Sequence, residues 1–211
     1  MCATSVYRAA DQVRMPWKNG AGTTLEVARA DDATTARMLW RVSIADVVDD
    51  GPFSTFDGYR RIISVLDGDG MLLTVDNVRS RPLRRHDSFS FDGGAVTNCE
   101  LLSGPIRDFN VIFASDRIVG RMRWAAVRGS EHVESMAETL LVYNAADAAV
   151  RVEPAADANA EADANAVAVS FEPGDCLRMD GGAGVRLLTS GAPQAVCAII
   201  ELSTHTNPLV E

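Results

Sequence analysis

Residues suited to binding a small anion are concentrated between Met15 and Arg29. Pro16 fixes its own backbone angle, and Gly20 and Gly22 permit sharp turns, so successive backbone N–H groups can point to one side of a loop. Such a concavity accepts anions, and the ammonium group of Lys18 would add a positive charge. We therefore predict an anion-binding loop in this stretch.

The alternative is an ordinary hairpin turn at Asn19-Gly20, with Lys18 exposed to solvent. A nucleotide-binding loop is excluded, because Gly20-x-Gly22 lacks a third glycine and is followed by a strand-like run instead of a helix. The Gly-Lys-Ser/Thr sequence of a phosphate-binding loop is also absent from this stretch.

Polar residues also recur at strand spacing, in which alternate side chains share one face. The pairs expected to share a face are Thr24 with Glu26, Arg41 with Ser43, and Asp108 with Asn110. Together with the loop and two further polar residues they form the candidate ligand-binding site: Lys18, Asn19, Gly20, Gly22, Thr24, Glu26, Arg41, Ser43, Ser54, Arg61, Asp108 and Asn110.

A small carboxylate is the ligand that this set favours, because the planar guanidinium group of arginine binds a carboxylate with two parallel hydrogen bonds. Arg41 or Arg61 would hold it, with Ser43 and Asn110 as neutral hydrogen-bond partners. The alternative is a structural network, in which the arginines are paired with Glu26 or Asp108, because a buried guanidinium must be paired. The sequence leaves both interpretations open.

Short β-rich runs separated by turn residues predict the all-β class. The run 39–45 alternates apolar and polar residues, and the runs 61–66 and 71–75 are joined by Asp67-Gly68-Asp69-Gly70, a hairpin signal. Nothing in the first 115 residues sustains a capped helical pattern. Later strands are expected at 88–91, 95–102, 109–113, 121–127, 139–143 and 148–152.

An internal repeat divides the chain. Residues 87–94, DSFSFDGG, recur as residues 175–182, DCLRMDGG, and the runs that follow each copy also correspond. We predict two cupin-like β-barrels from a duplicated unit: residues 1–115 with the polar site and residues 116–211 as a structural partner, with strands free to exchange between barrels. Asp108 and Asn110 have no polar counterparts in the second copy, which reads Ala195-Val196-Cys197.

The composition and net charge of the chain indicate which kinds of partner it can bind. The 211-residue chain is 47% hydrophobic and carries a net charge of −9, which disfavours nucleic acids and anionic membranes. It has no apolar run of signal-peptide or membrane-spanning type, so we expect a cytoplasmic protein, for which a homodimer is one conceivable assembly. Cys99, Cys176 and Cys197 lie in apolar runs and are expected to be free thiols of the core.

Residues 153–168 contain the pentapeptide Ala-Asp-Ala-Asn-Ala twice and almost no side chain that could pack. Asp and Asn oppose helix formation at these positions. We predict a mobile hairpin loop without a function of its own.

Four motifs in order along the chain resemble those of the HutD/Ves family: Pro16-Trp17-Lys18-Asn19-Gly20-x-Gly22-x-Thr24-x-Glu26, Trp40-Arg41-x-Ser43-Ile44-Ala45, Gly51-Pro52-Phe53-Ser54-x-Phe56-x-Gly58-x-x-Arg61, and Ser103-Gly104-Pro105 with Asp108-Phe109-Asn110. The resemblance covers nearly the whole chain. It departs from the family pattern at Ala21, where many members have glycine, and at Ile112, where methionine is usual.

The resemblance implies a bicupin fold and a non-catalytic, regulatory role in bacterial histidine utilisation. The ligand would be a pathway intermediate such as urocanate or formylglutamate. No cofactor is implied.

Two enzyme classes are the alternatives to a binding protein. A metal-dependent cupin enzyme would need clustered histidines, whereas His86, His132 and His205 are widely separated and lie outside the candidate set, so we predict no metal site. A metal-free enzyme could use Glu26 or Asp108 as acid or base. We expect arginines nearby to lower the pKa of such a carboxylate, which would make it a poor base at neutral pH.

Overall fold

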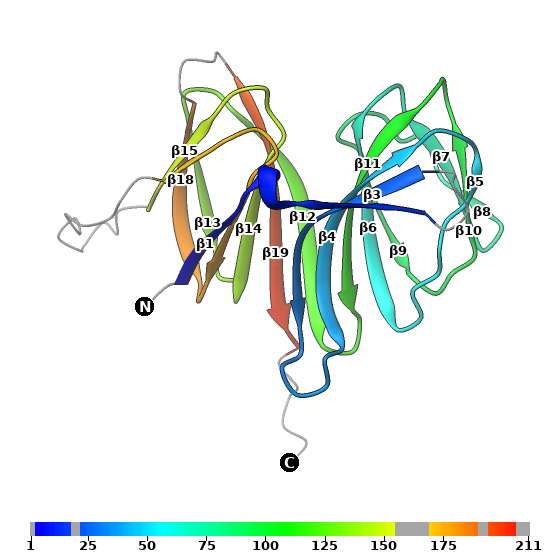
Figure 1. The fold of residues 1–211 in the computed structure, drawn as a ribbon, viewed down its shortest axis with the longest axis horizontal. Coiled ribbons are helices and arrows are strands. Elements are labelled where there is room, and N and C mark those ends of the chain that lie inside the picture. The colour runs from blue at the N-terminus through cyan, green and yellow to red at the C-terminus, as the bar shows by residue number, and fades with distance from the viewer. Residues whose placement is uncertain (1–2, 18–21, 155–168, 190–193, 206–211) are drawn as a thin grey trace. The chain divides into compact units, whose positions relative to one another are not determined.

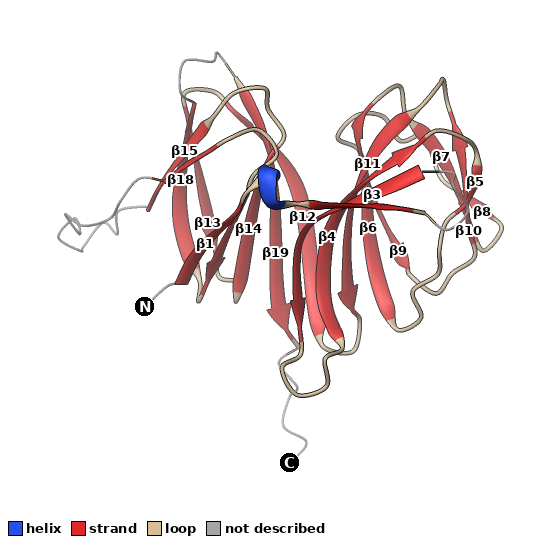
Figure 2. Cartoon of the chain, viewed as in Figure 1, coloured by secondary structure: helices blue, strands red, loops and turns tan. Residues whose placement is uncertain are grey.

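The computed structural model describes residues 3–17, 22–154, 169–189 and 194–205. Apart from one short 3-10 helix, η1 (Ala9–Asp11), the regular elements of these residues are all β-strands (Figure 2). The strands are β1 (Ala3–Tyr7), β2 (Val13–Pro16), β3 (Gly22–Asp31), β4 (Met38–Val47), β5 (Gly51–Pro52), β6 (Tyr59–Asp67), β7 (Met71–Val75), β8 (Val78–Arg79), β9 (Ser88–Asp92), β10 (Thr97–Leu101), β11 (Ile106–Ala114), β12 (Ile118–Val127), β13 (Ser130–Ser135), β14 (Thr139–Asn144), β15 (Val150–Pro154), β16 (Val169–Phe171), β17 (Cys176–Asp180), β18 (Ala183–Thr189) and β19 (Ala195–Thr204). The prediction of an all-β chain is confirmed.

The chain forms two compact units. The first unit comprises Gln12–Val119 with Thr204–Glu211, and the second comprises Met1–Asp11 with Gly120–Ser203. The N-terminal strand β1 therefore belongs to the second unit, where it pairs with β17.

Each unit contains a long and a short antiparallel sheet. In the first unit the long sheet has the order β2-β3-β4-β11-β6-β9 and the short sheet the order β5-β10-β7-β8 (Figure 1). In the second unit the long sheet has the order β1-β17-β14-β19-β12 and the short sheet the order β13-β18-β15-β16.

The two units repeat one topology. The run β9-β6-β11-β4 of the first long sheet has its counterpart in β17-β14-β19-β12, and the short sheets correspond strand by strand. The repeated sequences at 87–94 and 175–182 supply the equivalent strands β9 and β17. The predicted internal duplication and its cupin-like double β fold are confirmed.

Apolar side chains from both sheets of a unit form its core. In the first unit Ala45, Ile63 and Phe91 of the long sheet pack with Leu73 and Cys99 of the short sheet. The second unit has an equivalent cluster that includes Cys197 and Ile199 of β19. The period-2 alternation of the strands directs these residues inward and their sequence neighbours outward.

Cys99, Cys176 and Cys197 are buried free thiols, as the sequence predicted. Burial raises the pKa of each thiol to about 12, so all three stay protonated at neutral pH.

Residues 155–168, the main part of the predicted loop, lie outside the described residues. The strands on either side, β15 and β16, pair with each other in antiparallel register, with Val152 opposite Val169. The alanine-rich segment therefore connects two neighbouring strands. Among the residues that the structure describes, no helix is long and apolar enough to cross a membrane.

Candidate functional site

A cavity of about 550 Å³ lies within the first unit. Its wall combines aromatic rings, two guanidinium groups and a buried acid. The residues lining it are Pro16, Trp17, Thr24, Arg41, Ser43, Ala45, Pro52, Phe53, Ser54, Phe56, Arg61, Asp108, Asn110 and Ile112.

The register of the long sheet brings the polar residues together. On β4 and β11, Ser43 lies opposite Asn110 and Ala45 lies opposite Asp108. Ile112 lies opposite Arg41 on β4 and also opposite Arg61 on β6, so the two arginines flank one apolar residue. Since directly opposed residues share a face, all these side chains point to the interior between the sheets.

The second unit lacks this polarity at the equivalent places. Inward positions of β19, the counterpart of β11, are occupied by Ala195, Cys197 and Ile199, all part of the apolar core. The fold thus forms without polar residues at these three positions, and Asp108 and Asn110 in β11 are a specific feature of the first unit.

Arg61 is tied into the cavity wall. Its Nη2 donates a 2.7 Å hydrogen bond to Asn110 Oδ1, and its Nη1 donates a 3.2 Å hydrogen bond to the backbone oxygen of Ser54. Its guanidinium carbon lies 5.4 Å from the ring centre of Phe53 and 5.6 Å from that of Phe56. Burial lowers the pKa of Arg61 to about 10, and this side chain remains charged at neutral pH.

Arg41 is held differently. Its guanidinium carbon lies 5.3 Å from the ring centre of Phe56, and its buried Nε has no hydrogen-bond partner among the described residues. Burial lowers the pKa of Arg41, and the negative charge of Glu26 partly opposes this effect. A stacked guanidinium with unused donors that lines a cavity is suited to binding an anion.

Asp108 is the acid of the cavity and is only 1% exposed. Asn110 Nδ2 donates a hydrogen bond to Asp108 Oδ1. Burial raises the pKa of Asp108 to about 7, although the charge of Arg61 acts in the opposite direction. Our expectation of a lowered pKa is wrong, because the loss of hydration of the carboxylate outweighs the attraction of the arginine.

Trp17 closes one side of the cavity. Its indole Nε1 donates a 2.7 Å hydrogen bond to Thr24 Oγ1, and its backbone N–H donates a 2.9 Å hydrogen bond to the carbonyl of Gly22. A side chain at Gly22 would collide with the backbone oxygen of Asp46 and lie 3.1 Å from the indole ring. Gly22 is therefore required for the close approach that places Trp17.

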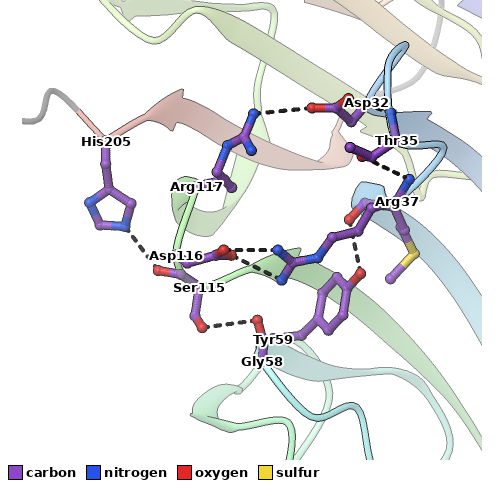
Figure 3. Close-up of polar contacts among 10 residues, drawn as sticks. Asp32, Thr35, Arg37, Gly58, Tyr59, Ser115, Asp116, Arg117 and His205 are labelled. Atoms are coloured by element: carbon purple, nitrogen blue, oxygen red, sulfur yellow. Dashed lines mark hydrogen bonds and ion pairs between the residues drawn. The ribbon is translucent and has the colours of Figure 1, made fainter.

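Phe53, Ser54 and Phe56 come from an irregular segment between β5 and β6, which is anchored at its far end. Ser115 donates two hydrogen bonds of 3.0 Å, from its backbone N–H and from Oγ, to the carbonyl of Gly58 (Figure 3). Arg37 bonds both carboxylate oxygens of Asp116, at 2.8 and 3.0 Å, and lies 5.5 Å from the ring centre of Tyr59 (Figure 3). This cluster fixes the chain where the aromatic segment enters β6.

Most of the described candidate residues line the cavity: Thr24, Arg41, Ser43, Ser54, Arg61, Asp108 and Asn110. Gly22 supports Trp17 from outside the lining. Glu26 lies opposite Ser43, on the face that Thr24 shares, but it is not among the residues that line the cavity; its negative charge acts on Arg41. Lys18, Asn19 and Gly20 lie outside the described residues.

The aromatic part of the wall was missing from the predicted site. Phe53 and Phe56 belong to the motif around Ser54, and their spacing on either side of a predicted site residue was the signal that could have identified them. Ile112 was noted only as a departure from the family pattern, yet it lies between the two arginines.

Metal-ligand chemistry finds no support in the described part of the chain, where no three His, Cys, Asp or Glu side chains are grouped to hold an ion. None of the three histidines lines the cavity. The donor set is instead two guanidinium groups, an amide, hydroxyl groups and one carboxyl group, which suits a small polar anion.

The family model HutD matches residues 9–197. The chain belongs to the HutD family. Among relatives, it is 47% identical over 145 residues to an uncharacterised 21.2 kDa protein in the hutC 3' region of Pseudomonas putida, a match that covers 69% of this chain and 75% of that protein. It is 36% identical over 110 residues to protein Ves of Citrobacter koseri, covering 52% of this chain and 57% of that one.

Two solved structures of Pseudomonas proteins resemble the chain over nearly its full length. One is a conserved protein of unknown function from Pseudomonas aeruginosa PAO1, with 38% identity, a TM-score of 0.82 and coverage of 96% of this chain and 99% of that one. The other is HutD from Pseudomonas fluorescens SBW25 in a formate condition, with 38% identity, a TM-score of 0.77 and coverage of 96% and 100%. The resemblance to the HutD/Ves family is confirmed.

The fold also resembles that of Bacillus subtilis oxalate decarboxylase, at a TM-score of 0.67 and 9% identity over 96% of this chain and 78% of that one. This likeness concerns the fold alone.

Proposed function

We propose that this HutD-family protein binds a small carboxylate metabolite in the cavity of its first unit and acts as a non-catalytic regulator of histidine utilisation. The proposal rests chiefly on Arg41: its guanidinium is stacked on Phe56 and lines the cavity, and its buried Nε has no hydrogen-bond partner among the described residues. A partly buried cation with an unused buried donor is costly to maintain unless a ligand supplies the missing acceptor.

Arg61 and Asn110 supply further polar groups around the proposed carboxylate. Arg61 has its two Nη groups bonded to the wall, and its Nε is buried without a partner among the described residues. Ser43 and Thr24 offer hydroxyl groups on the same lining. The aromatic rings of Trp17, Phe53 and Phe56 line the same cavity, and apolar surroundings strengthen the attraction of polar groups for an anion.

The family and its relatives support the metabolic setting. A relative from Pseudomonas putida is named for its position beside hutC, and a similar structure is named HutD and was obtained in a formate condition. Urocanate, formylglutamate, glutamate and formate are therefore the first compounds to test, and the cytoplasm is the compartment in which we expect the protein to meet them.

The test is a thermal-shift series with paired compounds that differ in one charge. At about 100 times its dissociation constant, a ligand that binds only the folded state adds about 2.7 kcal/mol to the free energy of unfolding. For a domain of this size, the melting temperature should rise by roughly 5–10 °C. Urocanate and formate should produce this shift, whereas urocanamide and formamide should not if the carboxylate is the recognised group. Equal shifts from acids and amides, or none at all, would contradict the proposal.

A metal-free acid–base enzyme is the second candidate function, and the observation that favours it is the pKa of about 7 for Asp108. A carboxyl group that titrates near neutral pH can both accept and donate a proton. Incubating the protein with each carboxylate in D₂O and following the solute by proton NMR tests this candidate. Conversion or deuterium incorporation that Asp108→Asn abolishes would establish catalysis, and an unchanged spectrum would favour the binding role.

A further inference from the structure

Asp108 is positioned to respond to the charge of any ligand in the cavity. It lines the cavity, is 1% exposed and is the only carboxyl group among the described lining residues. Its Oδ1 accepts a hydrogen bond from Asn110, whose Oδ1 in turn accepts the hydrogen bond of Arg61. The acid and the cation are thus joined through a single amide.

Few other charged groups reach Asp108. From β6, the positive charge of Arg61 favours its ionised form, and from β4 the negative charge of Asp46 disfavours it. Arg41, also on β4, lies opposite Ile112, two inward-facing rows from Asp108, and the negative charge of Glu26 on β3 acts on it. The thiol of Cys99 on β10 is neutral, because burial raises its pKa to about 12.

An incoming anion changes this balance in one direction. A carboxylate held by the guanidinium groups adds negative charge near Asp108, in a cavity of low dielectric constant. It also neutralises part of the positive charge of Arg61, which otherwise favours ionised Asp108. Asp108 cannot escape into water, because the side chain is buried. The remaining way to relieve the repulsion is to protonate the acid.

We propose that a carboxylate binds this cavity together with one proton, which Asp108 takes up from solvent. The inference rests on the proposed function and adds how the site is regulated: the occupied form contains the ligand anion and neutral Asp108. The same cavity would therefore bind carboxylates more weakly as the pH rises. The titration of Asp108 near neutral pH places this change in the physiological range.

Isothermal titration calorimetry with formylglutamate tests the proposal without a mutation. Both carboxyl groups of this probe are ionised above about pH 6, so any proton exchanged above that pH belongs to the protein. At pH 8, the binding enthalpy measured in phosphate, HEPES and Tris should vary with the ionisation enthalpy of the buffer, with a slope that approaches one proton taken up. At pH 6, the slope should be much smaller, because Asp108 already carries its proton.

The dissociation constant gives a second readout. For the wild-type protein, it should rise by up to about tenfold for each pH unit above about 7. Asp108→Asn keeps an acceptor for Asn110 and mimics the neutral acid, so its dissociation constant should be nearly independent of pH. Glu100→Gln is the matched control: Glu100 pairs with Arg79, does not line the cavity and is not among the charged groups that act on Asp108, so this variant should retain the pH dependence of the wild-type protein.

The outcomes distinguish proton uptake by Asp108 from carboxylate binding itself. Binding of formylglutamate with no proton uptake and a constant affinity between pH 6 and pH 9 would overturn the inference and leave the proposed function standing. The same pH dependence in Asp108→Asn as in the wild-type protein would also overturn it, since another group would then titrate. Failure of formylglutamate, urocanate, glutamate and formate to bind at any pH would overturn both.

Discussion

Arg61 Nη2 donates a 2.7 Å hydrogen bond to Asn110 Oδ1, and this bond commits Arg61 to the wall of the cavity. A further bond from Nη1 to the backbone oxygen of Ser54 attaches the same side chain to the aromatic segment. Arg41 lies on β4, on the other side of β11, and its buried Nε has no hydrogen-bond partner among the described residues. The two arginines therefore divide two tasks, since one braces the site and the other is available to a ligand.

This division predicts unequal effects on stability. Arg61→Ala leaves Asp108 and Asn110 buried without their cationic partner, and removal of one partner of a buried charged network costs about 3–5 kcal/mol. Arg41→Met keeps the stem that packs near Phe56 and should change the free energy of unfolding by less than about 1 kcal/mol. Urea denaturation of the two variants checks this. An Arg41→Met variant as unstable as Arg61→Ala would show that both arginines are structural.

Asp108 should make stability depend on pH. Its pKa rises from 3.8 to about 7 on folding, so between these values the unfolded state releases a proton that the folded state retains. The free energy of unfolding therefore falls as the pH rises from about 4 to about 7, and stays lower above pH 7. Asp108→Asn should abolish this fall in the free energy of unfolding, because asparagine does not titrate.

Melting temperatures of wild-type protein and Asp108→Asn at several pH values measure the effect. From pH 4 to pH 7, the free energy of unfolding of the variant should rise relative to that of the wild-type protein, by a few kcal/mol at most. Above pH 7 the difference should level off. A gap that stays constant over this range would mean that Asp108 does not titrate near neutral pH.

The anchoring of the aromatic segment can be tested at Gly58. Gly58 and Gly104 both have a positive φ, of 80° and 64°, where alanine is strained by roughly 1–2 kcal/mol. Only Gly58 accepts the hydrogen bonds of Ser115 at the start of β6, next to the segment that carries Phe53 and Phe56.

Gly58→Ala and Gly104→Ala should therefore destabilise the protein to a similar degree, but only Gly58→Ala should weaken carboxylate binding, by about tenfold or more. Thermal melts and calorimetry on the same samples provide the comparison. If both variants bind the ligand equally well, the position of the aromatic segment is not controlled from Gly58.

The sequence predicted the fold well, because alternation within strands and an internal repeat are both visible in one dimension. The face shared by Asp108 and Asn110 followed from strand spacing alone, and the register confirmed it. Glu26 also shares the face of Thr24, as strand spacing predicted, but the sequence did not reveal that the cavity wall leaves it out. The pKa of Asp108 was predicted in the wrong direction because its value depends on complete burial, which only the packed structure reveals.

The segment 155–168 should be replaceable. The flanking strands β15 and β16 are already paired, so a short Gly-containing turn can join Pro154 to Val169. The free energy of unfolding should change by no more than about 0.5 kcal/mol, as for surface changes that remove no packing. Urea denaturation measures it, and a loss of several kcal/mol would show that the alanine-rich segment packs against the protein.

The central claim is that Arg41 holds a carboxylate in the cavity of the first unit. Calorimetric titration of formylglutamate into wild-type protein, Arg41→Met and Arg60→Met tests it most directly, because Arg60 is the exposed neighbour of Arg61 on β6 and bonds Ser90 on the other face. We predict that Arg41→Met weakens binding by about 10- to 100-fold, in keeping with the loss of a charge-assisted hydrogen bond, while Arg60→Met binds as the wild-type protein does. Equal affinity in Arg41→Met and the wild-type protein would contradict the claim.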